Sequence, residues 1–149
     1  MKTRTKLAML LLGLALTLPS MAQKDSVDVM EYWNPLMDAI IQHESGGNVN
    51  AKCGSYLGPM QISPLLVRGV NNILKSRGEK TRYTLADRKS IQKSKEMFII
   101  VMSVYNKTND YDKAIRIWAG GPGYSIKGTQ KCVRETNAIL KKMGYEKKE

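Results

Sequence analysis

The stretch Met97–Tyr105, MFIIVMSVY, decides the fold class of this chain. Wound as a helix, it is apolar on nearly every side, and a helix that is apolar all round belongs in the interior of a domain. Thr84 followed by Asp87 resembles a capping box just before it. We therefore expect a long central helix over about residues 87–106, with the other elements packed around it.

Helix start signals stand on the N-terminal side of this central stretch. Asn34-Pro35 and Ser63-Pro64 each place a capping residue directly before a proline, which fits the first turn of a helix. The two helices that begin there are expected to stop at Gly46 and Gly78, respectively. Each of them carries apolar residues at helical spacing and should cover one face of the central helix.

The C-terminal side continues in the same way. Asp110 can cap a helix that reaches Trp118, and a last helix is expected over Thr129–Met143, closed by Gly144. Strand signals are nearly absent, because no run alternates cleanly between apolar and polar residues. The sequence thus predicts an all-α, single domain of about five or six helices around a central buried helix.

The N-terminus has the layout of a cleavable secretory signal over residues 1–22. Lys2, Arg4 and Lys6 precede an apolar run, Leu7–Leu18, and small residues follow at Ser20 and Ala22. The run is too short to span a bilayer, which takes about 20 apolar residues. No cysteine lies near the expected cut, so no lipid anchor is expected either, and we predict a periplasmic or extracellular protein.

The remaining chain divides into three parts. Residues 23–33 are polar and are expected to be a flexible lead-in, residues 34–143 form the domain, and residues 144–149 are a charged tail. The net charge is +11, and because the expected signal holds three basic residues and no acid, the mature chain would carry 11 − 3 = +8. This charge favours anionic partners, with solubility alone as the alternative. Nucleic acid is not expected, since basic and aromatic residues are not interleaved, and neither is membrane binding, since no clean basic amphipathic helix occurs.

Two cysteines, Cys53 and Cys132, are candidates for a disulfide in an exported protein. Two unpaired thiols are the alternative. A structural zinc site usually takes four ligands, and two cysteines with the single histidine, His43, do not supply them. We therefore expect neither a metal nor a cofactor.

Glu44 is the candidate for acid catalysis. It follows Ile40 and Ile41 by four and three residues, which puts it on their face of the helix, and that face should turn toward the core. Apolar surroundings and the negative end of the helix dipole both disfavour a charged carboxylate, so Glu44 should hold its proton near neutral pH. The alternative is an ordinary exposed helix-end glutamate. His43 should point elsewhere on the helix and take no part in catalysis.

Three short motifs, in this order, resemble those of the Slt-type lytic transglycosylases, relatives of goose-type lysozyme. They are Glu44-Ser45, then Gly58-Pro59-Met60-Gln61, then Ile117–Gly123, IWAGGPG. The family patterns are Glu-Ser, Gly-Leu-Met-Gln and Ala-Tyr-Asn-Ala-Gly, the last often followed by Pro-Gly. The resemblance covers roughly Asn34 to Met143 and implies a lysozyme-like fold.

The resemblance implies a lyase that cuts the β-1,4 bond between N-acetylmuramic acid and N-acetylglucosamine in peptidoglycan. Glu44 would protonate the glycosidic oxygen and then, as a base, take the proton of the C6 hydroxyl that closes a 1,6-anhydro ring. No second carboxylate occurs in the three motifs, whereas ordinary glycosidases need a pair. A distant acid such as Asp87 or Glu96 is the remaining source of a second one.

By the same resemblance, a set of residues around Glu44 would bind the glycan: Ser45, Tyr56, Met60, Gln61, Trp118, Gly121 and Tyr124. Several have simpler alternatives. Ser45 can be a plain turn serine, Met60 can be core filler, and Trp118 can be a core aromatic.

Departures from the family pattern keep other functions open. Pro59 replaces a leucine, Trp118 a tyrosine, and Ala119 the asparagine of the third motif. A lysozyme-type hydrolase and a non-catalytic glycan-binding or scaffold protein of the same fold are the alternatives. The partner would be peptidoglycan glycan strands, and the setting either general wall remodelling or a cell-envelope secretion or conjugation machine.

Overall fold

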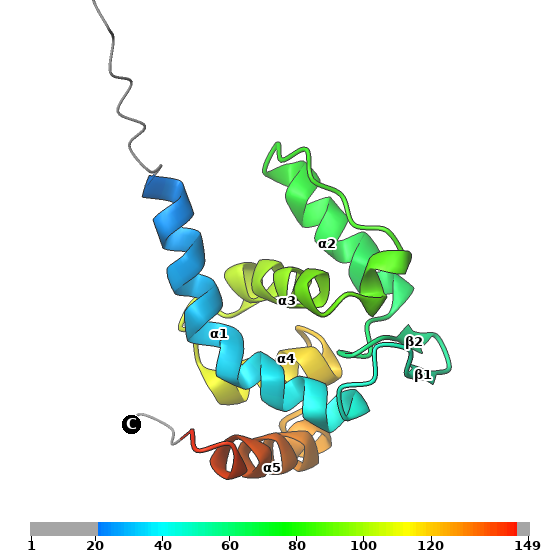
Figure 1. Ribbon diagram of the computed structural model, residues 1–149, viewed down its shortest axis with the longest axis vertical. Helices are drawn as coiled ribbons and strands as arrows, with labels where there is room; N and C mark the ends of the chain where they lie inside the picture. Colours follow the sequence, from blue (N-terminus) through cyan, green and yellow to red (C-terminus); the bar gives the residue numbers. More distant parts are fainter. Residues whose placement is uncertain (1–20, 146–149) are drawn as a thin grey trace, which may run out of the picture.

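The computed structural model describes residues 21–145, with side chains from residue 28 onward, and the chain is mostly helical there, as predicted (Figure 1). The described elements are, in order, α1 Met21–Ser45, β1 Lys52–Cys53, β2 Tyr56–Leu57, α2 Pro64–Ser76, the 3₁₀ turn η1 Ala86–Lys89, α3 Ile91–Tyr105, α4 Tyr111–Gly120 and α5 Ile126–Lys142. The two short strands pair antiparallel.

The central position of α3 is confirmed. Met97, Phe98 and Met102 of this helix are almost completely inaccessible to solvent, and they belong to one core that α1, α2, α4 and α5 all enter. Figure 1 shows α3 in the middle, with α2 on one side and α1 on the other, while α5 closes the bottom below α1. Burial of this one stretch therefore organises the domain.

The local start signals of two helices are confirmed. The Ser63 hydroxyl accepts a hydrogen bond from the Leu66 N–H at the start of α2, and the Asp110 carboxylate accepts one from the Lys113 N–H at the start of α4. The last helix begins three residues before the predicted Thr129, because Ser125 provides an earlier cap and accepts from the Gly128 N–H. Each cap satisfies a backbone donor that the first turn leaves free.

The central helix begins later than predicted, at Ile91. Residues 86–89 form η1 instead, and Ser90 caps α3 by accepting from the Lys93 N–H. The Thr84–Asp87 signal is real but local, since the Asp87 carboxylate accepts from the Thr84 N–H at 2.7 Å and closes the turn before η1. The signal therefore marked a 3₁₀ turn rather than the start of the long helix.

The prediction that a flexible lead-in over 23–33 precedes a helix start at Asn34-Pro35 is wrong. Helix α1 runs through both residues from Met21, with Pro35 inside it. An interior proline removes one backbone hydrogen bond and its ring crowds the carbonyl of Glu31, which bends a helix. Figure 1 shows this bend between the blue and cyan halves of α1. Asn34 does not cap the helix, and its Oδ1 accepts from Lys95 Nζ of α3 at 3.1 Å.

Tertiary contacts explain why the helix extends toward the N-terminus past Asn34. The Trp33 ring is buried, stacks on Tyr111 at a centroid distance of 5.5 Å and meets Phe98 edge-on. The Tyr32 hydroxyl donates to the Asn109 carbonyl, and the Tyr111 hydroxyl donates to the Tyr32 carbonyl. Burial raises the pKa of Tyr111 to about 12. These contacts hold the N-terminal half of α1 against the start of α4.

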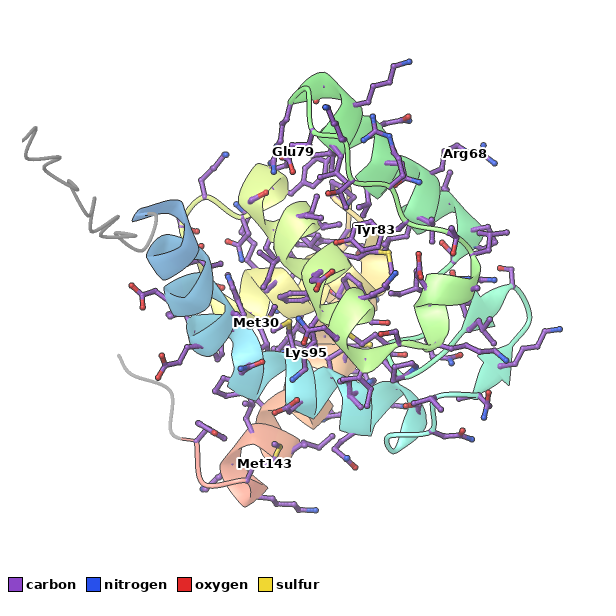
Figure 2. The ribbon with its side chains drawn as sticks, turned by 45° about the horizontal axis from the view of Figure 1, so that its top comes forward. Met30, Arg68, Glu79, Tyr83, Lys95 and Met143 are labelled. Atoms are coloured by element: carbon purple, nitrogen blue, oxygen red, sulfur yellow. The ribbon has the colours of Figure 1, made fainter. Side chains whose placement is uncertain are left out.

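A second link between α1 and α3 is ionic. Lys95 of α3, labelled in Figure 2, places its ammonium 2.6 Å from Asp38 Oδ1 of α1. Of the predicted signal segment, residues 1–20 lie outside the described residues, as do 146–149 of the charged tail. In the part of the chain that is described, no helix is long and apolar enough to cross a bilayer.

Candidate functional site

The loop after α1 carries the second motif and is held by its backbone. The Gly58 N–H donates to the Ala51 carbonyl at 2.8 Å, and Leu57 and Ile62 form an antiparallel bridge around the turn. Gly58 has a φ of +86°, and a Cβ at this position would lie 1.8 Å from the Arg88 carbonyl oxygen. Glycine is therefore required here both by the backbone conformation and by the close approach of η1.

Arg88 is the residue that fixes this loop, and no sequence pattern pointed to it. Its side chain is nearly buried and donates to the carbonyls of Leu85, Ser55 and Ile62 at 2.8, 3.0 and 3.2 Å. A buried guanidinium needs such acceptors to offset its lost hydration. The three acceptors come from two separate stretches of chain, so only the folded structure brings them together.

Ser45 joins the first motif to the second. Its hydroxyl lies 2.8 Å from the Pro59 carbonyl and 3.1 Å from the Ile41 carbonyl, and it also accepts from the Gly47 N–H at 3.1 Å. The serine thus ends α1 and ties that end to the loop. Its contacts in the structure are with the protein backbone, which is the turn role that the sequence left open as the alternative.

Trp118 joins the second motif to the third. Its indole Nε1 donates to the Met60 carbonyl at 3.2 Å, and its ring packs against Phe98 at a centroid distance of 5.2 Å. Met60 itself is fully buried, so its side chain is core filler, which is the simpler of the two roles expected for it. Together, the Ser45 and Trp118 bonds bring the three motif segments next to one another.

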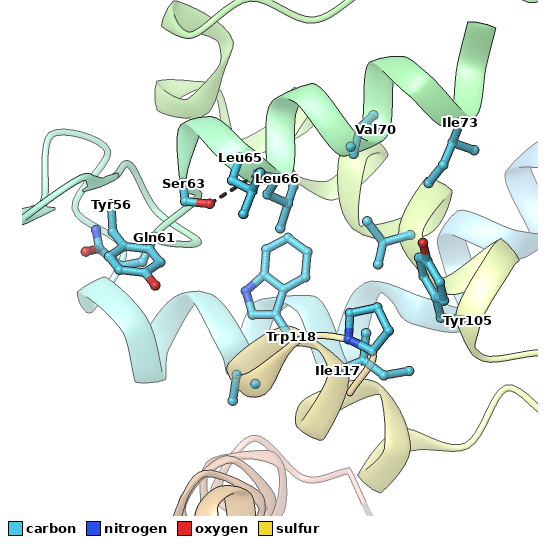
Figure 3. A pocket seen from close by; sticks show the side chains of 16 residues that line it. Tyr56, Gln61, Ser63, Leu65, Leu66, Val70, Ile73, Tyr105, Ile117 and Trp118 are labelled. Carbon is cyan, nitrogen blue, oxygen red and sulfur yellow. Dashed lines mark hydrogen bonds between the residues drawn. The ribbon is translucent and has the colours of Figure 1, made fainter. Parts of the chain in front are cut away.

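An open groove of about 440 Å³ runs along the third motif. Figure 3 shows Trp118 projecting into it from α4 toward Leu66 of α2, with Tyr56 and Gln61 at one end and Ile73 and Tyr105 at the other. Its lining is Tyr56, Gln61, Ser63, Leu65, Leu66, Gly69, Val70, Ile73, Val101, Tyr105, Ile117, Trp118, Ala119, Gly120, Gly121 and Pro122.

Four of the residues predicted to bind a ligand line this groove: Tyr56, Gln61, Trp118 and Gly121. Tyr124 instead packs against the hydrophobic core from a partly buried position. Neither Glu44 nor Ser45 is among the described residues that line the groove. The α2 wall was missed, although the apolar residues of α2 recur at helical spacing, because the same spacing is equally typical of a helix face that packs into the core.

The Gln61 side chain is already engaged by its own loop. Its amide nitrogen donates to the carbonyls of Ala51 and Gly58 at 3.0 and 2.9 Å. Its backbone φ of +48° lies in the left-handed region, which is uncommon for a residue with a side chain. Gln61 therefore helps to hold its own loop and shapes the end of the groove.

Glu44 is less buried than predicted. Ile40 and Ile41 of the same helix face are buried, whereas the Glu44 side chain keeps 26% of its surface exposed. It lies in the last turn of α1, where the helix ends at Gly46 and Gly47, both with positive φ. The carboxyl group is thus at the border of the core, adjacent to the Ser45 link and open to solvent.

The prediction that His43 points away from Glu44 is wrong. Its Nδ1 lies 3.4 Å from Glu44 Oε1, and its Nε2 lies 3.2 Å from Glu135 Oε2 of α5. The imidazole therefore stands between two carboxyl groups, one on each helix. Neighbouring residues of a helix normally diverge, but here the Glu44 side chain, in the last turn of α1, turns toward the ring.

The predicted disulfide does not form. Cys53 and Cys132 are both free thiols, Cys53 exposed on β1 and Cys132 partly buried on α5. Burial raises the pKa of the Cys132 thiol, and the negative charges of Glu44 and Glu135 raise it further. Cys132 thus belongs to the surroundings of Glu44 rather than to a cross-link.

The two distant acids considered from the sequence are engaged elsewhere. Asp87 pairs with Lys93 at 2.8 Å, and Glu96 accepts from the Tyr83 hydroxyl and from Gln92, both at 3.0 Å. The hydrogen bond from Lys93, followed by that from the Thr84 N–H, holds the pKa of Asp87 below its usual range. Among the described residues, no cluster of His, Cys, Asp and Glu could hold a metal ion.

Compared with known proteins, the chain matches no family model, no curated protein and no solved structure. What the site can do must therefore be argued from the geometry of its own residues.

Proposed function

We propose that this protein is a peptidoglycan lytic transglycosylase of lysozyme-like fold, with Glu44 as its only acid and base. The observation that carries the proposal is the pair of hydrogen bonds from Ser45 to the Pro59 carbonyl and from Trp118 to the Met60 carbonyl. These bonds bring together the three motif segments, which lie far apart in the chain, and residues of the second and third motifs line one open groove.

The position of Glu44 supports a role in proton transfer. Its carboxyl group is partly exposed, so a glycosidic oxygen can reach it, and its surroundings are partly apolar. A general acid must come within hydrogen-bond reach of the oxygen that it protonates. In an intramolecular reaction, the C6 hydroxyl of the sugar replaces water as the nucleophile, so one carboxyl group serves as acid and then as base.

The groove supports the choice of a saccharide ligand. Trp118 and Tyr56 offer aromatic surfaces, which are suited to the apolar faces of sugar rings. The Ser63 hydroxyl and the Gln61 amide are the polar groups at the same end. A mostly apolar groove with a few fixed polar groups is typical of a site that orients a small ligand or a chain segment.

Product analysis tests the proposal. Purified peptidoglycan is digested with the wild-type chain and with Glu44→Gln, and the released fragments are analysed by mass spectrometry. We expect 1,6-anhydro-muropeptides from the wild type and a loss of at least about 100-fold in their formation with the variant. Fragments with free reducing ends would instead identify a lysozyme-type hydrolase.

A non-catalytic glycan-binding protein is the second candidate, favoured by two observations. Ala119 places no polar group in the groove where the family has an asparagine, and the Gln61 amide nitrogen is occupied by its own loop. This candidate predicts that the chain is retained on peptidoglycan without releasing any fragment. Release of fragments that depends on Glu44 would exclude it.

The expected setting follows from the substrate. Peptidoglycan lies outside the cytoplasmic membrane, so we propose that the chain is exported and acts in the cell envelope, in general remodelling or beside a secretion or conjugation machine. Export is tested by sequencing the N-terminus of the mature protein. An N-terminus at Gln23 would agree with the expected cleavage after Ala22.

A further inference from the structure

A chain of polar contacts links the end of α1 to α5 behind the candidate acid. It runs from Glu44 through the two nitrogens of His43 to Glu135, and it continues to Lys131 Nζ, 3.9 Å from the other oxygen of Glu135. The His43 side chain is largely buried, with 19% of its surface exposed, while Glu135 is open to solvent at 42%. The imidazole is therefore the inner member of the chain and the carboxylate of Glu135 the outer one.

The partners of His43 determine where its hydrogen lies when the ring is neutral. A carboxylate can only accept hydrogen bonds, so the Glu135 carboxylate favours the tautomer with the hydrogen on Nε2. Nδ1 is then an acceptor, and it faces Glu44 Oε1. An acceptor at this place suits a protonated Glu44, whose O–H can point at the ring.

The charged and titratable groups around the ring come from two elements. Glu44 is on α1 itself, and α5 contributes Glu135, Lys131 and the Cys132 thiol, which senses the charges of both glutamates. Two carboxyl groups therefore face the ring, one at each nitrogen, and the cation next to Glu135 is the largely exposed ammonium of Lys131. A protonated ring donates from both nitrogens and so favours the charged form of Glu44.

We propose that His43 is a positioning residue that orients the Glu44 carboxyl group and couples its proton to Glu135. The proposal rests on the function proposed above, in which Glu44 is the acid. When the ring is neutral, its Nδ1 accepts a hydrogen bond from the protonated Oε1 of Glu44. When the ring is protonated, Nδ1 carries a hydrogen itself and can no longer accept. The chain thus sets the pH range over which Glu44 can act, with Glu135 as the group that tunes it.

The coupling is directly measurable because His43 is the only histidine in the chain. Its imidazole signals in an NMR titration of the full chain need no assignment among several rings. Removing a nearby negative charge makes the protonated ring less stable. In Glu44→Gln and in Glu135→Gln, we therefore expect the pH at which the His43 signals move to fall by at least about half a pH unit.

Glu79→Gln is the matched control. Glu79 is as exposed as Glu135, at 46%, and also lies 3.9 Å from a cation, Arg77, but far from α5. The control should leave the His43 titration where it is. If neither Glu44→Gln nor Glu135→Gln moves the titration more than this control does, the proposed coupling is wrong.

Activity then separates positioning from simple structural support. His43→Phe keeps a planar ring without nitrogens, and we expect a fall in fragment release of about tenfold, with the alkaline decline moved to lower pH because the protonated acid loses its acceptor. Glu135→Gln, on a side chain that is 42% exposed, should move the acidic decline to lower pH. If the contacts of His43 with Glu44 and Glu135 only supported the fold, both variants would have lower thermal stability and an unchanged pH profile of activity.

The two proposals fail separately. If no fragments are released by the wild type while the His43 titration responds to Glu44→Gln, the lyase function is wrong and the coupled pair stands. If fragments are released but His43→Phe and Glu135→Gln keep the wild-type pH profile, the positioning role is wrong and the lyase function stands.

Discussion

The end of α1 and the wall formed by α2 are two regions of opposite character, and the second-motif loop, Gly58–Gln61, lies between them in the chain. On the side of α1 and α5, polar groups meet at defined distances: the Ser45 hydroxyl with the Pro59 carbonyl, and His43 with two carboxyl groups. On the side of α2, the groove wall consists of apolar side chains, Leu65, Leu66, Val70 and Ile73. On the polar side, hydrogen bonds fix the positions of individual atoms. On the apolar side, only the shape of the wall restricts what can pack against it.

Under the proposed function, this difference would separate the orientation of the acid from the binding of the ligand. Hydrogen bonds depend steeply on angle and distance, so the polar side can hold a reacting group. Apolar contacts are not directional, so the α2 wall can tolerate ligands that shift along the groove. The following changes test the division, beginning with the loop that both sides share.

Gly58→Ala should have the largest effect. Its Cβ would meet the Arg88 carbonyl at 1.8 Å, where backbone has to move, and the residue would keep an unfavourable positive φ. We expect a loss of about 3 kcal/mol or more in the free energy of unfolding, measured by urea denaturation. Fragment release and retention on peptidoglycan should both be reduced, because both sides of the site depend on this loop.

Gly54→Ala provides the matched control, because Gly54 also has a positive φ, of +59°, but nothing lies within 4 Å of its Cβ position. Only the backbone cost should remain there, about 1 kcal/mol. Equal losses in the two variants would contradict the tight contact between the loop and η1.

Ser45→Ala should disrupt only the polar side of the site, at the end of α1. It removes the donor to the Pro59 carbonyl and the acceptor of the Gly47 N–H, so we expect a loss of about 1–2 kcal/mol in unfolding free energy. Fragment release should fall more than ligand retention does. Ser76→Ala, at the end of α2 with one exposed bond to the Ile73 carbonyl, should cost less than about 0.5 kcal/mol.

Asp87→Asn weakens the turn that precedes Arg88, and its effect should depend on pH. Because the pKa of Asp87 is lowered in the folded state, its carboxylate stabilises the fold fully above the ordinary value of 3.8, and this contribution disappears as the pH falls through the lowered value. The stability difference between wild type and variant should therefore be constant from neutral pH to about pH 5 and shrink in more acidic solution. A difference that grows on acidification would refute the assignment.

Leu65→Ala should have the smallest effect on stability and act on the apolar side alone. The side chain is 71% exposed, so unfolding free energy should change by less than about 0.5 kcal/mol, while retention on peptidoglycan weakens. Ile126→Ala, on a side chain 68% exposed at the start of α5 and outside the groove, should leave retention unchanged. Equal retention of the two variants would exclude the α2 wall as a binding surface.

Local signals predicted the fold where the cause was local. Ser63 and Asp110 cap their helices as their sequence positions indicate, and the apolar stretch of α3 is buried as its composition indicates. The start of α1 was missed because Asn34-Pro35 satisfies the local rule for a helix start. The contacts that extend the helix past it, from Trp33 to Tyr111 and Phe98, join residues far apart in the chain.

The candidate site likewise has some features that the sequence predicts and others that only the folded structure shows. The order of the three motifs was readable, and Ser45, Gln61 and Trp118 do lie on adjoining segments. Arg88 and Glu135 were not readable, because an ordinary basic or acidic residue on a helical stretch is normally solvated. Their roles depend on carbonyls and an imidazole that the chain supplies from elsewhere.

The length of α1 has a practical consequence for handling the protein. Helix α1 contains Gln23, the first residue that would remain after the expected cleavage, and at about 1.5 Å per residue it places Glu44 roughly 30 Å from Gln23, less the shortening at the Pro35 bend. Glu44 thus lies at one end of a built-in spacer. A resin, a sensor chip or a fluorophore coupled at the Gln23 end would leave the groove free for an insoluble polymer to approach.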